Sequence, residues 1–186
     1  MATDGLIEED RRFIRDTSAS VFTRDRILAG TCRMLEPIQH ARLKEEIADH
    51  FSIHANAIVV VGSAKLGYSI NPSKKLKPFD DVSDIDVAVV HGRLFEMYWL
   101  KMYEARQNLV EWPDIGDARK YLFRGWIRPD KLPLFSIRNA WFDFFTDLQA
   151  RGVAGSYAIR AGLYFNVEFL ETYQLHGVRQ TFPEFQ

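Results

Sequence analysis

Two short apolar runs, residues 57–61 and 85–90, give the clearest hydrophobic pattern in the chain. The first reads Ala-Ile-Val-Val-Val and the second reads Ile-Asp-Val-Ala-Val-Val. Continuous apolar stretches of this length that are rich in β-branched residues favour strands buried on both faces. We therefore predict two core strands. Residues 69–82 between them hold two prolines, several charges and few apolar anchors, which predicts a loop.

A third strand is predicted over residues 156–165, where apolar and polar side chains alternate. Helical periodicity fills most of the remaining chain. Thr23 has the character of an N-cap, and the apolar spacing after it predicts a helix that reaches about Leu35. Residues 1–20 are predicted to form a loosely held arm. Further helices are predicted over residues 38–50, 94–109, 117–126, 141–148 and 167–179.

The order of these elements predicts the fold class. Helices come first, followed by a strand, a loop, a second strand, more helices, a third strand and a last helix. This order is typical of a small α+β (mixed α/β) fold, with a short mixed sheet and helices packed on it. A chain of 186 residues is also of the size of one domain, so we predict a single domain over residues 1–186.

Composition and charge narrow the classes of partner. Hydrophobic residues make up 47% of the chain, and the net charge of −1 gives no bulk field that would attract a polynucleotide or an anionic membrane. Cys32 is the only cysteine, which excludes a disulfide framework or a cysteine zinc cluster within one chain. We find no apolar signal peptide and no membrane span. We therefore expect a cytoplasmic protein with no direct membrane insertion.

The second strand carries a pair of acids. Residues two apart in a strand point the same way, so Asp84 and Asp86 project together from the start of that strand. Two neighbouring carboxylates repel each other unless a cation lies between them. Magnesium prefers a few carboxylate oxygens together with phosphate oxygens and water. The pair therefore predicts a site for Mg²⁺ (or Mn²⁺) that carries a triphosphate.

A glycine and a serine end the first strand. Gly62 would let the backbone approach a phosphate closely, and the hydroxyl of Ser63 and nearby amides could donate hydrogen bonds to phosphate oxygens. Lys65 is close enough in sequence to add a positive charge. A glycine-serine turn or an Asp-x-Asp pair alone is usually structural. The two together, each attached to an apolar strand, favour a nucleotide-binding function.

These residues resemble the signature of the DNA polymerase beta-like nucleotidyltransferase superfamily, on Gly62-Ser63 and on Ser83-Asp84-Ile85-Asp86-Val87-Ala88-Val89-Val90. The resemblance implies two magnesium ions and transfer of a nucleotidyl group from an NTP or dNTP to a hydroxyl acceptor, with release of pyrophosphate. It implies that Gly62 and Ser63 bind the triphosphate and that Asp84 and Asp86 bind metal and are catalytic.

A narrower resemblance concerns the Gly-Trp-Ile-x-Pro segment, residues 125–129, in so compact a chain. It is similar to the small nucleotidyltransferases of bacterial antiphage defence, including Hailong-type proteins. This implies an oligonucleotide signal as product and an effector protein as partner. Two alternatives remain open. One is a transferase of antitoxin type that attaches a nucleotide to a toxin protein. The other is an inactive module that binds a nucleotide or a partner.

The family normally has a third carboxylate on the third strand, and the strand predicted here has none. Glu168 is the best candidate outside it, although the dipole of the last helix alone would favour an acid there. Asp143 and Asp147 are predicted to face water. Arg160 could neutralise a phosphate or pair with a surface acid, and these two interpretations are equally supported.

Four other features have alternative interpretations. The lysines of the loop, Lys74, Lys75 and Lys77, could close over a triphosphate or form a solvated surface. Tyr164 and Tyr173 could stack on a base or serve as a self-acceptor, but core packing is the commoner role. Trp112, Trp126 and Trp141 are also expected in the core rather than stacked on a base. The five histidines show no ligand spacing, so none is assigned to a metal.

Overall fold

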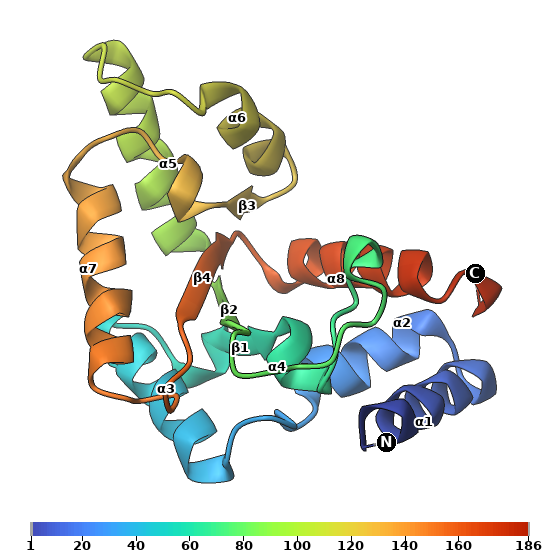
Figure 1. Ribbon diagram of the computed structural model, residues 1–186. Helices are drawn as coiled ribbons and strands as arrows, with labels where there is room; N and C mark the ends of the chain where they lie inside the picture. Colours follow the sequence, from blue (N-terminus) through green and yellow to red (C-terminus); the bar gives the residue numbers. More distant parts are fainter. Residues whose placement is uncertain (1, 186) are drawn as a thin grey trace.

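A four-stranded sheet lies at the centre of the computed structural model, which describes residues 2–185 (Figure 1). The strand order is β1-β2-β4-β3, and the strands are β1 Ile58–Val61, β2 Ile85–Val90, β3 Trp126–Ile127 and β4 Ile159–Tyr164. β1 is antiparallel to β2, β2 is parallel to β4, and β3 is antiparallel to β4. The predicted α+β class with a short mixed sheet is confirmed.

Helices surround the sheet. They are α1 Ala2–Asp16, α2 Ala19–Phe22, α3 Pro37–Phe51, α4 Gly62–Leu66, α5 Gly92–Gln107, α6 Ile115–Phe123, α7 Ser136–Ala150 and α8 Val167–Thr181. A π-helix, Thr23–Ala29, continues α2, and four 3₁₀ turns cover Ala55–Ala57, Pro72–Lys74, Pro129–Lys131 and Pro183–Phe185. Within residues 2–185, no helix is both long enough and apolar enough to cross a membrane.

The alternation of side chains along β2 separates two hydrophobic cores. Ile85, Val87 and Val89 belong to the core that includes buried residues of α3, α5 and α7. Ala88, on the opposite face, belongs to the core that includes buried residues of α1, α2 and α8. Asp86 shares this second face because it lies two residues before Ala88. The alternation therefore fixes which helices can flank the acid pair.

The N-terminal segment differs from the prediction of a loose arm. Residues 2–16 form α1, where Asp10 is fully buried and Ile14 packs into the second core. Leu6, Ile7, Phe13 and Ile14 follow a helical spacing, but the charged Asp10 lies within the same stripe and disguises it. Met1 and Gln186 lie outside the described residues.

The helix predicted to begin at Thr23 begins earlier and ends earlier. Ser18 is the N-cap of α2 and accepts a hydrogen bond from the amide of Val21 at 3.2 Å. Thr23 lies inside the helical run, where its hydroxyl donates to the carbonyl of Ala19 at 2.8 Å. The run ends at Ala29, well before Leu35. A buried threonine that bonds to its own helix is hard to distinguish from an N-cap in sequence.

The strand β3 is the element that the sequence does not predict. Residues 117–126 are predicted as one helix, but α6 ends at Phe123, and Gly125 adopts a φ of +62°. Trp126 then pairs with Tyr164 across β3 and β4. A strand of two residues is too short to show an alternating pattern. The other predicted helices and the third strand are confirmed with small shifts at their ends.

Candidate functional site

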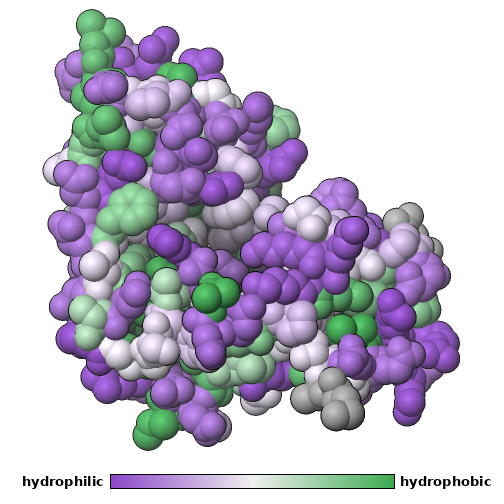
Figure 2. All heavy atoms as spheres, viewed as in Figure 1, coloured by the Kyte–Doolittle hydropathy of each residue, from purple (hydrophilic) through white to green (hydrophobic). Residues whose placement is uncertain are grey.

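A cleft of about 680 Å³ opens on the sheet face that carries Asp86. Figure 2 shows the surface hollowed between the part of the molecule with α5 and α6 and the part with α8. Its lining includes Gly62, Ser63, Lys74, Asp86, Arg160 and Gln174. These residues come from the β1–α4 turn, the loop after α4, β2, β4 and α8, and further lining residues come from α7 and from β3 with the turn that follows it, so the fold assembles the cleft from segments far apart in the chain.

The structure brings Asp84, Asp86 and Arg160 together, as the sequence alternation predicts for the first two. Asp86 pairs in register with Val61 on β1 and with Arg160 on β4. The Nε atom of Arg160 lies 3.8 Å from Oδ2 of Asp84. Among the described residues, no side chain or amide donates a hydrogen bond to the carboxylate of Asp86. This carboxylate is therefore free to bind a ligand.

The environment of Asp86 is electrostatically unfavourable for its own charge. Burial and, to a smaller extent, the neighbouring charge of Asp84 raise the pKa of this carboxyl to about 6, although Lys74 and Arg160 act in the opposite direction. Two carboxylates that share a partly buried edge are each destabilised by the other. A divalent cation between them would relieve that repulsion. The donor set at this edge therefore suits a hard cation.

Gly62 is required by its contact with Asp86. It adopts a φ of +68°, and a Cβ atom added to it would lie 2.5 Å from Oδ2 of Asp86. Any side chain here would displace the carboxylate, and the positive φ would strain the backbone as well. The glycine-serine turn thus lies directly against the acid pair. Ser63 follows in α4, and its side chain also lines the cleft.

Lys65 does not belong to the site, which corrects the sequence prediction. Its side chain is only 2% exposed, and its Nζ donates to the carbonyl of Gly30, away from the cleft. Burial lowers the pKa of this lysine to about 8. The lysine that lines the cleft is Lys74, from the loop between the two core strands. Lys77 of the same loop pairs with Asp80 at 2.8 Å on the surface.

The three candidate third acids do not join the pair. Asp84 and Asp86 lie at the start of β2, and β4 runs parallel to it, so Glu168 follows the far end of the sheet and is exposed. Asp143 and Asp147 are exposed on α7, where Asp147 pairs with Arg151 at 2.8 Å. Over residues 2–185, no three Asp, Glu, His or Cys side chains are grouped to hold a metal.

The acid pair therefore fits one divalent cation and does not fit the pair of magnesium ions that the resemblance implies. Two carboxylates can bridge one cation that keeps phosphate and water ligands. A second cation would need further oxygen ligands, and the side chain that faces Asp86 across β4 is the cationic Arg160.

Two polar side chains in the cleft lack partners. Tyr164 is 4% exposed and Gln174 is 5% exposed, and both line the cleft. Neither the hydroxyl of Tyr164 nor the amide of Gln174 has a hydrogen bond to any described residue. Buried polar groups are normally satisfied, so these two point to a ligand that enters the cleft. The sequence does not single out Gln174, because one polar residue on a helix carries no signal.

Trp126 forms one wall of the cleft. Its indole stacks on Tyr164 with ring centroids 5.4 Å apart, and it lies so close to Gly162 that a Cβ there would be 2.4 Å from Nε1. That buried indole N–H also has no partner among residues 2–185. Tyr173 packs on the same ring and is 41% exposed, so it offers a surface on which a base could stack.

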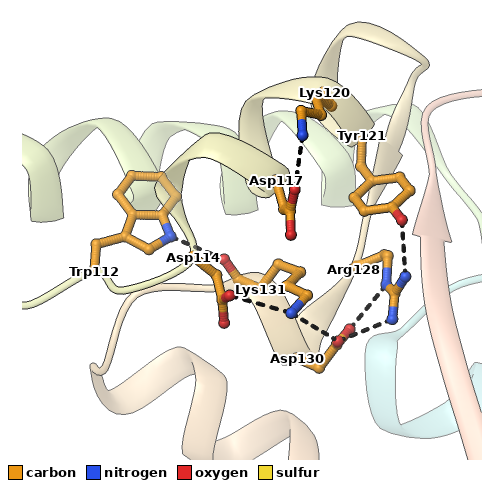
Figure 3. Close-up of polar contacts among 8 residues, drawn as sticks. All are labelled: Trp112, Asp114, Asp117, Lys120, Tyr121, Arg128, Asp130 and Lys131. Carbon is orange, nitrogen blue, oxygen red and sulfur yellow. Dashed lines mark hydrogen bonds and ion pairs between the residues drawn. The ribbon is translucent and has the colours of Figure 1, made fainter.

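A polar network centred on Arg128 and Asp130 lies next to Trp126 in the sequence (Figure 3). Arg128 donates to both carboxylate oxygens of Asp130, at 3.0 and 2.9 Å, and to the hydroxyl of Tyr121 at 3.0 Å. Its guanidinium also lies over the Trp126 ring, 5.5 Å from the centroid. Lys131 connects the network to Asp114. Arg128 and Asp130 also line the cleft, so this network both forms and supports the wall.

The chain matches no family model, no curated protein and no solved structure. The interpretation of the cleft accordingly rests on its own geometry and chemistry.

Proposed function

We propose that the cleft binds a nucleoside triphosphate together with a divalent cation, and that the protein transfers the nucleotidyl group to a hydroxyl acceptor. One observation carries the proposal: a glycine that must be glycine lies against the unpartnered carboxylate of Asp86, beside a second acid and two cations. That arrangement combines close backbone approach, ligands for a hard cation, and positive charge for phosphate oxygens.

Each group in the cleft has a distinct part in this proposal. Asp84 and Asp86 would hold Mg²⁺ or Mn²⁺, which neutralises phosphate charge when it is bound. Gly62 leaves room for a phosphate, and the Ser63 hydroxyl can donate to its oxygens. Lys74 and Arg160 face the same space and would attract a polyanion. These two side chains would therefore offset part of the charge that remains on a triphosphate once the cation has balanced the two acids.

The transfer itself needs no covalent intermediate on the protein. The acceptor oxygen attacks the α-phosphorus and forms a new P–O bond, while the bond to the β-bridging oxygen breaks. Pyrophosphate leaves with the electron pair of that bond, and the acceptor proton passes to solvent. The protein contributes alignment and charge stabilisation, which are the main sources of catalysis in such reactions.

The test is product formation from each labelled ribo- and deoxyribonucleoside triphosphate in Mg²⁺ or Mn²⁺. We expect pyrophosphate release by the wild type and a loss of at least about 10³-fold in Asp86→Asn, since removal of a catalytic ligand normally costs this much. Asp81→Asn is the matched control, because Asp81 is an exposed acid outside the cleft lining. Equal rates in wild type and Asp86→Asn would contradict the proposal.

The same products decide the acceptor. Free oligonucleotides would support a signal synthase, including one with a role in antiphage defence and an effector partner. A nucleotide attached to a protein, and released by protease only as a peptide adduct, would support the antitoxin-type alternative. Both outcomes keep the nucleotidyl transfer.

A second candidate function is nucleotide binding without transfer. The observation that favours it is Arg160 opposite Asp86, where a third acid would complete a larger metal site. Saturable binding of triphosphate with Mg²⁺, without pyrophosphate release in the presence of any acceptor, would support this function over the first.

A further inference from the structure

Arg160 has a position in the cleft that its sequence context alone does not reveal. It is paired in register with Asp86 on the neighbouring parallel strand, and its Nε lies 3.8 Å from the carboxylate of Asp84. The side chain is 64% exposed and lines the cleft, so the guanidinium can reach a ligand there while it stays beside both acids. From the sequence, Arg160 could either neutralise a phosphate or pair with a surface acid. The acid with which it pairs is Asp84, which belongs to the site, so Arg160 can do both.

The ligands at this edge limit how many cations it can hold. The two carboxylates carry two negative charges at most, and the guanidinium, which stays protonated, offsets one of them. One divalent cation can be bound by both carboxylates together with phosphate oxygens. A second divalent cation would lie beside the fixed positive charge of Arg160 and would find no third carboxylate in residues 2–185.

Two polar side chains besides the acids also favour a ligand at this edge. Tyr164 follows Arg160 on the same face of β4, four residues further along the strand, and Gln174 enters the cleft from α8. Both are more than nine-tenths buried, and both lack hydrogen-bond partners within residues 2–185. Such groups are normally satisfied by a partner or by water, so their position in the cleft favours the binding of a polar ligand.

We propose that the site uses one divalent cation, held by Asp84 and Asp86, and that the guanidinium of Arg160 supplies the fixed positive charge that a second cation would otherwise supply to the triphosphate. This inference rests on the proposed function and specifies how many cations take part and which side chain contacts the phosphates. It assigns Arg160 to direct contact with phosphate oxygens, for which its planar group of donors is suited.

The experiment counts Mn²⁺ ions by electron paramagnetic resonance. The α,β-methylene analogues of the four ribo- and four deoxyribonucleoside triphosphates are tested first, and the analogue that binds most tightly is used with the full chain. We expect one Mn²⁺ per wild-type complex, with no spin coupling. In Arg160→Glu, which adds a third acid, we expect two coupled ions, since two-cation sites hold their ions about 4 Å apart.

A matched control and a second variant keep the result interpretable. Arg119→Glu makes the same charge change on the exposed surface of α6 and should retain one ion. Arg160→Gln removes the charge without adding a ligand and should also retain one ion, but we expect affinity for the analogue to fall about tenfold and turnover about 10²-fold. Arg160→Lys should restore part of both.

Three outcomes are distinguishable. Two ions in the wild-type complex would overturn the inference and leave triphosphate binding intact. Unchanged affinity and turnover in Arg160→Gln would overturn it as well, because the guanidinium would then not contact the phosphates. If no analogue binds the wild type at all, the proposed function itself fails, and the inference fails with it.

Discussion

Two carboxylates in this protein, those of Asp10 and Asp86, lie away from solvent in different environments. Asp10 on α1 is fully buried and is bound by both guanidinium nitrogens of Arg33, at 2.6 and 2.8 Å, and by the hydroxyl of Tyr68 at 2.7 Å. Asp86 on β2 is partly buried beside another acid and receives no hydrogen bond from the described residues. The first charge is satisfied within the fold and joins α1 to the rest of the molecule. The second is left for a ligand.

The largest expected effect concerns the satisfied acid. Asp10→Ala should lower the free energy of unfolding by about 3–5 kcal/mol, because it breaks a buried ion pair and leaves the buried Tyr68 hydroxyl without its acceptor. The half-buried Arg33 would keep only Glu9, at 3.8 Å, and the carbonyl of Leu66 as partners. Urea unfolding measures this loss. Glu8→Ala is the control, since Glu8 is an exposed acid on the same helix. If Asp10→Ala changed triphosphate affinity in the folded protein without changing stability, the comparison between the two acids would be wrong.

Gly62→Ala tests how closely the turn must approach Asp86. The added Cβ would meet the Asp86 carboxylate, so we expect triphosphate affinity to fall by at least about tenfold and the free energy of unfolding by about 1–2 kcal/mol. Gly116→Ala adds a Cβ to α6, where nothing lies within 4 Å, and serves as the control. Affinity measured by calorimetry would be unchanged in Gly62→Ala only if phosphate did not approach this turn.

The unsatisfied acid should cost stability. The raised pKa of Asp86, about 6, means that the native state holds this proton more tightly than the unfolded state does. The free energy of unfolding should therefore fall as pH rises from about 4 through 6. In the absence of divalent cations, we expect Asp86→Asn to be more stable than wild type at pH 7 by on the order of 2 kcal/mol.

That advantage should vanish near pH 4, where the wild-type carboxyl is protonated in both states. Thermal or urea unfolding at several pH values gives the comparison, and Asp81→Asn, an exposed acid in the loop, should show no such trend. A variant Asp86→Asn less stable than wild type at pH 7 would show that the fold itself needs this charge.

The smallest effect is expected at Glu168. It lies beyond the far end of β4, exposed at the start of α8, so Glu168→Gln should leave turnover within about twofold of wild type. A large loss of pyrophosphate release in this variant would return Glu168 to the site as a third acid and would contradict the single-cation site.

The sequence predicts those parts of the fold that depend on short-range pattern. The β-branched runs at 57–61 and 85–90 are strands, and the alternation along the second run places Asp84 and Asp86 on one face. The pattern fails where a polar residue is buried, because Asp10 interrupts the apolar stripe of α1. It also fails for β3, which is too short to alternate.

The site shows a similar division. Which lysine reaches the cleft depends on the fold, so distance along the chain from Gly62 does not predict it. Lys65, three residues from Gly62, turns into the protein, while Lys74 returns to the cleft through the loop. The partner of Asp86 on β4 depends on a strand register that one sequence does not contain. Gln174 becomes a candidate only in the structure, where its buried side-chain amide has no hydrogen-bond partner among the described residues.

The most direct test of the account is equilibrium binding of the α,β-methylene triphosphate analogues to the wild type and to Asp86→Asn, with and without Mg²⁺. We expect wild-type binding that requires Mg²⁺ and weakens by about 10²-fold in Asp86→Asn, while Asp81→Asn binds as the wild type does. Equally tight binding by wild type and Asp86→Asn, or binding that is indifferent to Mg²⁺, would contradict the assignment of this acid pair to a cation-bound triphosphate.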